Sequence, residues 1–171
     1  HPNEARRKIG FLTGSTGLYA RLNAHELIDY FASLYGVSNQ LLTERKKYLF
    51  DLLDMNEFAH KRIGKLSTGM KQKVSICRTM IHDPEIVIFD EPTSGLDVIT
   101  AESIIQLIRD CKAQNKTVIF SSHIMGEVDL LCDSLAIIHK GQMKYQGSMQ
   151  EFREKMSEKS ITAEFIKTVQ A

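Results

Sequence analysis

Two adjacent carboxylates, Asp90 and Glu91, directly follow the apolar run at residues 86–89. Such a run is typical of a strand buried on both faces of a parallel sheet, and open α/β sheets bind ligands at the carboxyl ends of their strands. Asp90 could hold Mg²⁺, usually through water, while Glu91 could orient or deprotonate an attacking water. An isolated Asp-Glu-Pro sequence is more simply a capping turn, but the neighbouring motifs favour the catalytic interpretation.

A second chemical feature is the start of a helix at Ser67, Thr68 and Gly69. The first N–H groups of a helix and the positive end of its dipole suit a phosphate. Gly69 carries no side chain where an anion would approach the backbone. Without the downstream motif, a simple Ser67 N-cap would be the preferred interpretation.

A third candidate, His123, follows the predicted strand at residues 117–120. The ends of neighbouring parallel strands meet at one edge of a sheet, so His123 is predicted to face the same crevice as Glu91 and to contact a phosphate. The other five histidines have no comparable setting. Between His60 and Met80 the chain carries cations and no acid, which we interpret as a solvated helix face without individual catalytic roles; these cations are Lys61, Arg62, Lys65, Lys71, Lys73 and Arg78.

The elements that must position these groups fall into a helical part and an alternating part. Residues 8–12 predict a short strand, and Asn23 with Glu26 predicts a capping box for a helix that ends near Gly36. A second helix is predicted to start at Thr43. Residues 15–84 contain no convincing strand and therefore predict a helical subdomain.

From residue 85 onward, apolar runs alternate with helical patterns. Strands are predicted at residues 86–89, 117–120, 135–139 and 142–146, with helices between the first three, around residues 104–111 and 125–132, and a turn at Gly141 between the last two. This alternation predicts a parallel α/β sheet. The tail carries Ile161, Phe165, Ile166 and Val169 at amphipathic helical spacing. We therefore divide the chain into a core strand (1–14), a helical subdomain (15–84), a second core segment (85–156) and an amphipathic tail (157–171).

Composition limits the broad class of protein. The chain has 171 residues, is 43% hydrophobic and carries a formal net charge of +1, so it can bury a core and shows no field that favours nucleic acid or a membrane surface. Its apolar runs are too short to span a bilayer, and its polar start predicts no signal peptide. Cys77, Cys111 and Cys132 match no metal spacing and predict reduced thiols.

Taken together, these motifs resemble the ATP-binding subunits of ABC transporters, and the resemblance covers nearly the whole chain. Residues 66–70 (LSTGM) resemble the family signature LSGGQ, residues 86–90 its Walker B strand, and residues 94–97 (SGLD) its D-loop. Residues 9–19 are similar to bacterial export subunits of the sodium-extrusion group.

The resemblance implies a P-loop-type α/β core, ATP and Mg²⁺ as ligands, and an active site shared between two subunits. It assigns Mg²⁺ support to Asp90, water activation to Glu91 and the γ-phosphate to His123. It also assigns ATP contacts to Ser67, Thr68 and Gly69 and coupling between the two sites to Asp97. The helical subdomain would meet a separate membrane permease, and the subunit would be cytoplasmic, peripheral to the inner face of the membrane. The resemblance does not identify the transported substrate.

Three departures qualify this resemblance. The signature has Thr68 and Met70 in place of Gly and Gln, and the Q-loop glutamine aligns with Gly14. No GxxxxGK[ST] phosphate-binding loop occurs in the sequence. We therefore expect a fragment of the domain that lacks its P-loop strand and is catalytically incompetent alone. The resemblance places the missing strand between the strand before His123 and the strand at residues 135–139, so the exposed edges predict self-association or re-pairing.

Two alternatives from other classes remain open. A non-transport ABC ATPase that acts on ribosomes or chromosomes would carry the same motifs and would bind RNA or DNA in a salt-dependent way. A non-catalytic interaction module would supply only the signature half-site to an intact ATPase partner. No nucleic-acid partner is expected for the favoured transporter function.

Overall fold

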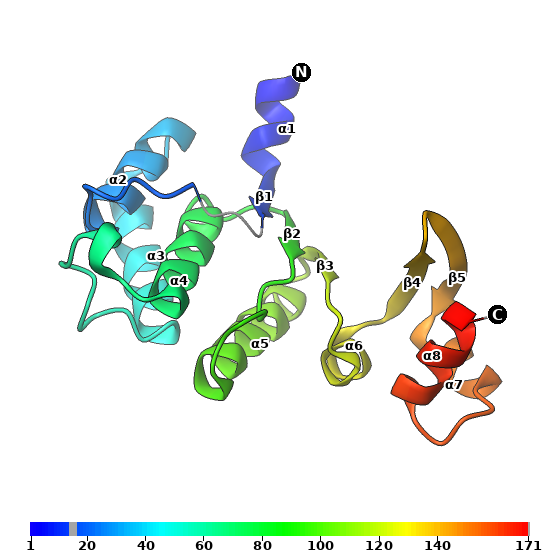
Figure 1. Ribbon diagram of the computed structural model, residues 1–171. Helices are drawn as coiled ribbons and strands as arrows, with labels where there is room; N and C mark the ends of the chain where they lie inside the picture. The colour runs from blue at the N-terminus through cyan, green and yellow to red at the C-terminus, as the bar shows by residue number, and fades with distance from the viewer. Residues whose placement is uncertain (14–16, 171) are drawn as a thin grey trace. The chain divides into compact units, whose positions relative to one another are not determined.

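The computed structural model of the protein describes residues 1–13 and 17–170. The chain forms two compact units, His1–Ser121 and Ser122–Ala171, whose elements are drawn in Figure 1. The boundary between the units falls inside the segment 85–156 of the sequence-based division, and that four-part division remains a proposal. Gly14, at the predicted Q-loop position, lies outside the residues that the structure describes.

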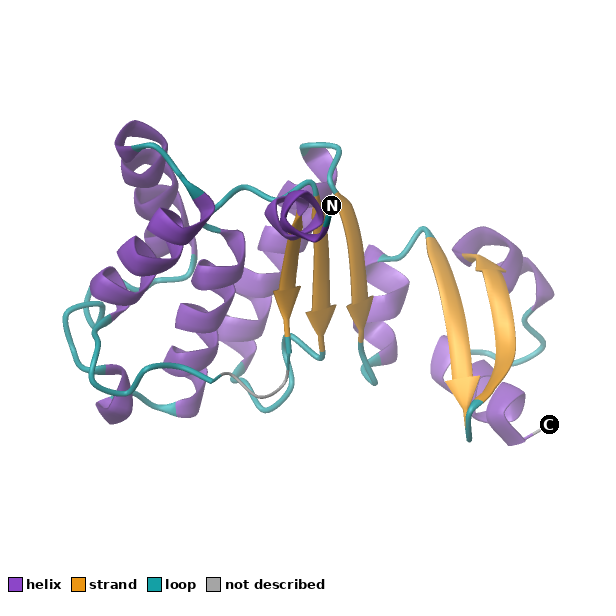
Figure 2. Ribbon diagram, turned by 90° about the horizontal axis from the view of Figure 1, so that it is seen from above, coloured by secondary structure: helices purple, strands orange, loops and turns teal. Residues whose placement is uncertain are grey.

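The first unit contains a parallel sheet of three strands in the order β1 (Ile9–Leu12), β2 (Ile86–Asp90) and β3 (Thr117–Ser121). Figure 2 shows the three arrows running in one direction. Helix α1 (Pro2–Lys8) leads into β1, and α5 (Val98–Ala113) connects β2 to β3. The three predicted strands and the parallel sheet are therefore confirmed for this unit.

The prediction that β2 is buried on both faces is wrong. Val87 and Phe89 are buried, whereas Ile86 and Ile88 are half-buried. In the strand register Ile88 lies between Phe11 and Ile119, which are 57% and 56% exposed. Helix α4 (Thr68–Met80) packs on the opposite face, where Thr79 lies against β1. Within the described chain this second row of side chains receives no comparable cover.

Helices α2 (Ala24–Tyr35) and α3 (Asn39–Leu52) form the helical subdomain with α4 and the short 3₁₀ helix η1 (Ile63–Lys65). The capping box is confirmed: Glu26 N–H donates to Asn23 Oδ1 at 3.0 Å, and Asn23 N–H donates to Glu26 Oε2 at 2.9 Å. Gly36 ends α2 with φ 71°, in the left-handed region that glycine adopts readily.

The predicted start of the second helix at Thr43 is wrong, because α3 begins at Asn39. The Ser38 side chain accepts a hydrogen bond from the Leu41 N–H and caps this earlier start. Thr43 lies inside the helix and its hydroxyl donates to the Asn39 carbonyl at 2.9 Å. A threonine can satisfy its hydroxyl in this way within a helix as well as at a cap.

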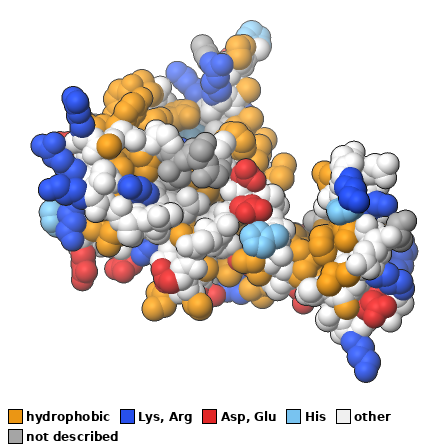
Figure 3. Space-filling view, viewed as in Figure 1, with side chains coloured by type: hydrophobic (Ala, Val, Ile, Leu, Met, Phe, Trp, Pro, Cys, Tyr) orange, Lys and Arg blue, Asp and Glu red, His pale blue; other side chains and the backbone are white. Residues whose placement is uncertain are grey.

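The cationic stretch before Met80 is only partly a solvated face. Lys61, Arg62 and Lys65 are exposed, but Lys73 is only 8% exposed. Arg78 is half-buried and lies over the Phe31 ring, 5.3 Å from its centroid. Figure 3 shows exposed Lys and Arg side chains gathered over the helical part of the unit. The interpretation as a wholly solvated face is therefore wrong for the inward side of α4, which packs in the core.

The three cysteines form no disulfide. Cys77 and Cys111 are buried, and burial raises the pKa of both thiols, that of Cys111 to about 11. Cys132 is half-buried. Raised pKa values keep the two buried thiols protonated and unreactive near neutral pH.

The second unit contains α6 (Met125–Leu131), β4 (Ser134–His139), β5 (Gln142–Ser148), α7 (Met149–Lys155) and α8 (Ile161–Gln170). Strand β4 pairs with β5 in an antiparallel hairpin, so its inclusion in the parallel sheet is wrong for the described chain. The connection consists of Lys140 and Gly141, both with positive φ, 48° and 75°. This two-residue turn pairs the strands locally and needs no distant partner.

The amphipathic tail is confirmed as α8, with one exception. Ile161, Phe165 and Val169 pack against a cluster formed by Ile137, Met149 and Phe152. Ile166, which was predicted to share this face, is 46% exposed. The tail therefore completes the core of the second unit.

Candidate functional site

The carboxylate pair at the end of β2 is organised by Ser121 on the neighbouring strand. Asp90 pairs with Ser121 in the parallel register, and the Ser121 hydroxyl donates to Asp90 Oδ1 at 2.7 Å. The same hydroxyl oxygen accepts the Glu91 N–H at 2.9 Å. Sequence reasoning missed this residue, although its position at the end of the adjacent predicted strand was a usable signal. Ser121 thus connects the side chain of Asp90 to the backbone of Glu91.

Glu91 adopts a backbone conformation that is uncommon for its residue type. Its φ is 45°, in the left-handed region that costs a non-glycine residue free energy. The turn continues with a hydrogen bond from Ser94 N–H to the Glu91 carbonyl at 3.2 Å. Gln72 Nε2 of α4 donates to the Pro92 carbonyl at 3.1 Å and ties this turn to the helix. Both acidic residues are exposed, so their carboxylates are accessible to a ligand.

The signature-like turn begins α4. Ser67 is its N-cap and accepts the Met70 N–H at 3.2 Å, so the simpler capping role is present. Capping uses only the third helical N–H, and those of Thr68 and Gly69 have no acceptor within the helix. Space above Gly69 is open, because a Cβ there would meet only Leu96 Cδ2, at 3.7 Å. The turn can therefore both cap the helix and present two donors to an anion.

Asp97 lies beside this turn and is the N-cap of α5. Its carboxylate accepts the Thr100 N–H at 3.0 Å and the Thr100 hydroxyl at 2.8 Å. These two hydrogen bonds hold the pKa of Asp97 below its usual value. Asp97, Ser67 and Gly69 line one cavity of about 240 Å³. The other residues of its lining are Asp54, Glu57, Phe58, Lys61, Met70, Lys73 and Thr100.

The structure thus brings together three of the predicted site residues, Ser67, Gly69 and Asp97, in one cavity. Asp90 and Glu91 lie at the end of β2 and are not part of its lining. His123 is exposed and belongs to the second unit, two residues beyond the end of β3. Its predicted phosphate contact remains a prediction.

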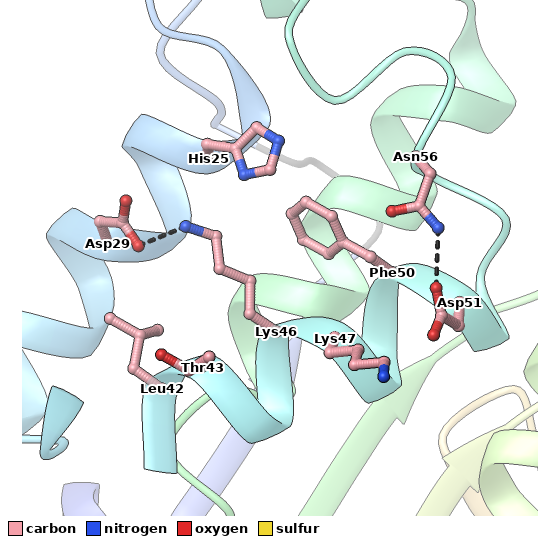
Figure 4. A pocket seen from close by; sticks show the side chains of 9 residues that line it. All are labelled: His25, Asp29, Leu42, Thr43, Lys46, Lys47, Phe50, Asp51 and Asn56. Atoms are coloured by element: carbon pink, nitrogen blue, oxygen red, sulfur yellow. Dashed lines mark hydrogen bonds and ion pairs between the residues drawn. The ribbon is translucent and has the colours of Figure 1, made fainter. Parts of the chain in front are cut away.

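A larger cavity of about 330 Å³ lies between α2 and α3 and contains none of the predicted site residues. Figure 4 shows Lys46 extended toward Asp29, its ion-pair partner at 2.5 Å, with Phe50 and His25 nearby. In this cavity the charges of Lys46 and Asp29 are already paired with each other. We assign no ligand to it.

The donor chemistry near β2 suits a hard cation. Carboxylate and hydroxyl oxygens are the ligand types that Mg²⁺ prefers, and Mg²⁺ usually retains several waters. Across the described ranges, no cluster of three or more His, Cys, Asp or Glu side chains could hold a metal by itself. Asp90 therefore fits a cation that is held mainly by water and by a phosphate ligand.

Fold and site together define an α/β nucleotide-binding domain, and comparison with known proteins identifies its family. Residues 1–94 match the family model described as ABC transporter, and the chain belongs to this family, in its ATP-binding class. It is 42% identical over 166 residues to the ABC transporter ATP-binding protein NatA of Bacillus subtilis (strain 168), covering 96% of this chain and 67% of that protein.

Two further similarities agree with this assignment. The linearmycin resistance ATP-binding protein LnrL of Bacillus subtilis (strain 168) is 34% identical over 140 residues, covering 82% of this chain and 45% of LnrL. A solved structure titled "Structure of ATP binding subunit of ABC transporter" superposes with a TM-score of 0.89 at 26% identity. That match covers 98% of this chain and 70% of the other. The ABC ATPase fold is therefore confirmed.

Members of this family bind ATP, typically with Mg²⁺, and work as dimers with membrane permease subunits. Among the helices that the structure describes, none is both long and apolar enough to cross a membrane.

Proposed function

We propose that this chain is part of the ATP-hydrolysing subunit of a bacterial ABC exporter, which powers transport through a separate membrane permease. The observation that carries the hydrolytic part is the arrangement at the end of β2. There Ser121 holds Asp90 by its side chain and Glu91 by its backbone, at 2.7 Å and 2.9 Å. An exposed glutamate with a constrained backbone is suited to orient an attacking water.

In the proposed dimer, each active site combines the phosphate-binding loop of one subunit with the turn at Ser67, Thr68 and Gly69 of the other. The two unpartnered N–H groups of that turn would hold the γ-phosphate against the helix dipole. Asp97, at the edge of the same cavity, would couple the two sites.

The remaining roles belong to the strand ends. Asp90 would support the Mg²⁺ ion, whose chemistry is to neutralise charge on the phosphates. Glu91 would accept a proton from the attacking water, and His123 would contact the γ-phosphate. Similarity to NatA, an ABC transporter ATP-binding protein, supports a role in transport, while the transported substrate would depend on the membrane subunit.

We further propose that these 171 residues alone bind ATP weakly and hydrolyse it negligibly, because their sequence contains no GxxxxGK[ST] loop. Calorimetric titration of ATP into the chain tests this proposal. The expected result is no saturation in the micromolar range, and micromolar binding would refute it.

Strand β3 supports the proposal that the isolated chain self-associates. It pairs with β2 on one side, and among the described strands nothing pairs on its other side. Ile119, a residue of β3 itself, has an exposed side chain and adds apolar surface to this strand. Unpaired apolar edges favour pairing with another chain. Sedimentation analysis should show concentration-dependent dimers, and a monomer at all concentrations would contradict this proposal.

The helical subdomain would transmit closure of the dimer to the permease. In that role the subunit would be cytoplasmic, peripheral to the inner face of the membrane. Fractionation of cells with and without the permease checks that location: membrane recovery should require the permease.

The decisive test of function is Glu91→Gln in the complete subunit, which includes a phosphate-binding loop. The change keeps the size of the side chain and removes the base, so ATP binding should remain while turnover falls by about 10²–10⁴-fold. Glu85→Gln is the matched control, because Glu85 immediately precedes the opposite end of β2 and pairs with Lys8 at 3.3 Å. Wild-type turnover in Glu91→Gln would overturn the assignment.

A further inference from the structure

Lys73 is the least explained charged side chain of the signature helix. It is 8% exposed, and lysine is rarely buried to this extent unless it is paired. Within residues 1–13 and 17–170, its ammonium has no hydrogen bond or ion pair. Lys71, two residues earlier on α4, is only half-buried. The two lysines therefore differ in environment although they share a helix.

The ammonium of Lys73 is directed by the helix toward the signature-like turn. Long side chains of a helix point back toward its N-terminus, and residues four apart lie on the same face. Lys73 follows Gly69 by four residues, and both line the 240 Å³ cavity. Within the described chain, Arg45 Nε and His82 Nδ1 are the side-chain polar atoms that are both fully buried and unpartnered. The Lys73 ammonium, which also lacks a partner, therefore retains access to the cavity.

The cavity lining carries both signs of charge: Lys61 and Lys73 are its cations, and Asp54, Glu57 and Asp97 are its carboxylates. Lys73 is a buried residue of the lining, whereas Lys61, Asp54 and Glu57 are exposed residues of it. The Asp97 carboxylate is already engaged by Thr100. A largely buried ammonium without a counter-ion costs free energy, although this one keeps contact with the cavity. An anion that enters this cavity would give the Lys73 ammonium the partner that the described residues do not provide.

The size of the cavity restricts that anion. Pockets for whole drug-sized ligands occupy about 300–1,000 Å³, and this cavity has about 240 Å³. It can admit one anionic group of a larger ligand. Donors from a helix start together with a lysine form a typical phosphate environment.

We propose that Lys73 is a phosphate-contacting residue of this half-site, supplying positive charge to the nucleotide that a second subunit presents. This inference rests on the proposed function, because it needs two subunits that close on ATP. It adds a side-chain cation to a contact that otherwise consists of the Ser67–Gly69 turn. Removing that cation weakens ATP-dependent closure while leaving the fold intact.

The test compares Lys73→Met with Lys71→Met in the complete subunit. Methionine preserves most of the length of the lysine stem and removes the charge. Loss of a charge-assisted contact should raise the KM for ATP about tenfold or more. It should also weaken ATP-dependent dimerisation of the Glu91→Gln background by a similar factor. Lys71→Met should leave both quantities at the wild-type values, and Lys73→Arg should retain most of the affinity.

A thermal unfolding measurement separates this role from a structural one. Removing an unpaired, largely buried charge should leave the Tm of Lys73→Met unchanged or higher. If Lys73→Met does not fold, Lys73→Gln replaces it in the same assays. An unchanged KM and unchanged ATP-dependent dimerisation in a folded variant would overturn the inference. The inference would also be overturned if Lys73→Met dimerised less than wild type when no ATP is present. The counter-ion of Lys73 would then be a protein carboxylate and not a phosphate.

The outcome is distinguishable from failure of the proposed function. If wild-type protein hydrolyses ATP and Glu91→Gln does not, the function stands whatever Lys73→Met shows. If neither wild type nor Lys71→Met hydrolyses ATP, the function itself fails.

Discussion

Asp90 and Ser121 are register partners on neighbouring parallel strands, and the Ser121 hydroxyl donates to Asp90 Oδ1 at 2.7 Å. The same oxygen accepts the Glu91 N–H at 2.9 Å. One hydroxyl therefore holds both acidic residues, one through its carboxylate and one through its backbone. The proposed metal-supporting and water-activating groups are positioned relative to each other by a residue that carries neither role.

Removing this hydroxyl should reduce catalysis more than binding. In the complete subunit, Ser121→Ala leaves the Glu91 backbone and the Asp90 side chain without their shared partner, so kcat should fall about tenfold with a smaller change in KM. Ser121→Thr keeps the hydroxyl and should restore most of the activity. Steady-state ATPase kinetics measure both values, and an unaltered kcat in Ser121→Ala would contradict the positioning role.

The left-handed backbone of Glu91 predicts an unusual order of stability among its variants. Glycine adopts φ near 45° without the steric cost paid by other residues, so Glu91→Gly should be about 1 kcal/mol more stable than Glu91→Ala. Urea denaturation of the chain measures the difference. At Asp90, a regular strand position, the order should reverse, because glycine destabilises strand interiors. If alanine were at least as stable as glycine at position 91, as expected at position 90, the strain assigned to the Glu91 backbone would be contradicted.

Close packing between β1 and α4 depends on Gly10. A Cβ at this position would lie 2.8 Å from the Thr79 carbonyl oxygen and 2.9 Å from Pro84 Cγ. Gly10→Ala should therefore destabilise the chain by about 1–3 kcal/mol. Gly126→Ala is the control, because a Cβ there meets nothing within 4 Å and alanine favours helix α6. Equal unfolding free energies for the two variants would contradict this packing argument.

His82 predicts a loss of stability in mild acid. Its ring stacks on Tyr35 with centroids 3.8 Å apart, and its Nδ1 atom is buried without a partner. Burial lowers the pKa of His82 below its ordinary value, while a hydrogen bond to the Ile9 carbonyl opposes that effect. The unfolded chain therefore binds more protons, and stability falls as the pH drops from about 6.5 toward the folded pKa.

The measurement is the unfolding free energy of wild type and His82→Phe at pH 7 and pH 5. Phenylalanine keeps the ring stacked on Tyr35 and does not titrate, so the variant should lose less stability on acidification. Burial also lowers the pKa of His25, so the difference between the two proteins, and not the whole pH dependence, reports on His82. Equal losses would exclude His82 as the cause.

Local sequence signals were sufficient for several elements. The capping box at Asn23 and Glu26 involves residues three apart, and the turn at Gly141 needs only a residue that tolerates positive φ. The apolar runs of β2 and β3 could be identified because polar residues flank each of these short strands. Each of these features depends on neighbours in the sequence, so each could be predicted without a structure.

Other features depended on contacts between distant segments. Choice of Ser38 over Thr43 as the start of α3 was missed because both residues can cap a helix. Strand β4 was assigned to the parallel sheet, whereas a two-residue turn pairs it with β5. Lys73 was interpreted as solvated, because its position in a cationic run reveals nothing about the packing that buries it.

By itself, the sequence determined the family and the residue types of the half-site, since the signature turn, the carboxylate pair and the Asp97 loop are contiguous motifs. Only the tertiary structure decided that Ser121 holds Asp90 and Glu91, that Asp97 shares a cavity with Ser67 and Gly69, and that Lys73 is buried beside them. The reason is physical: strand register and burial arise from packing between segments far apart in the chain, whereas motifs record chemistry within a few neighbouring residues.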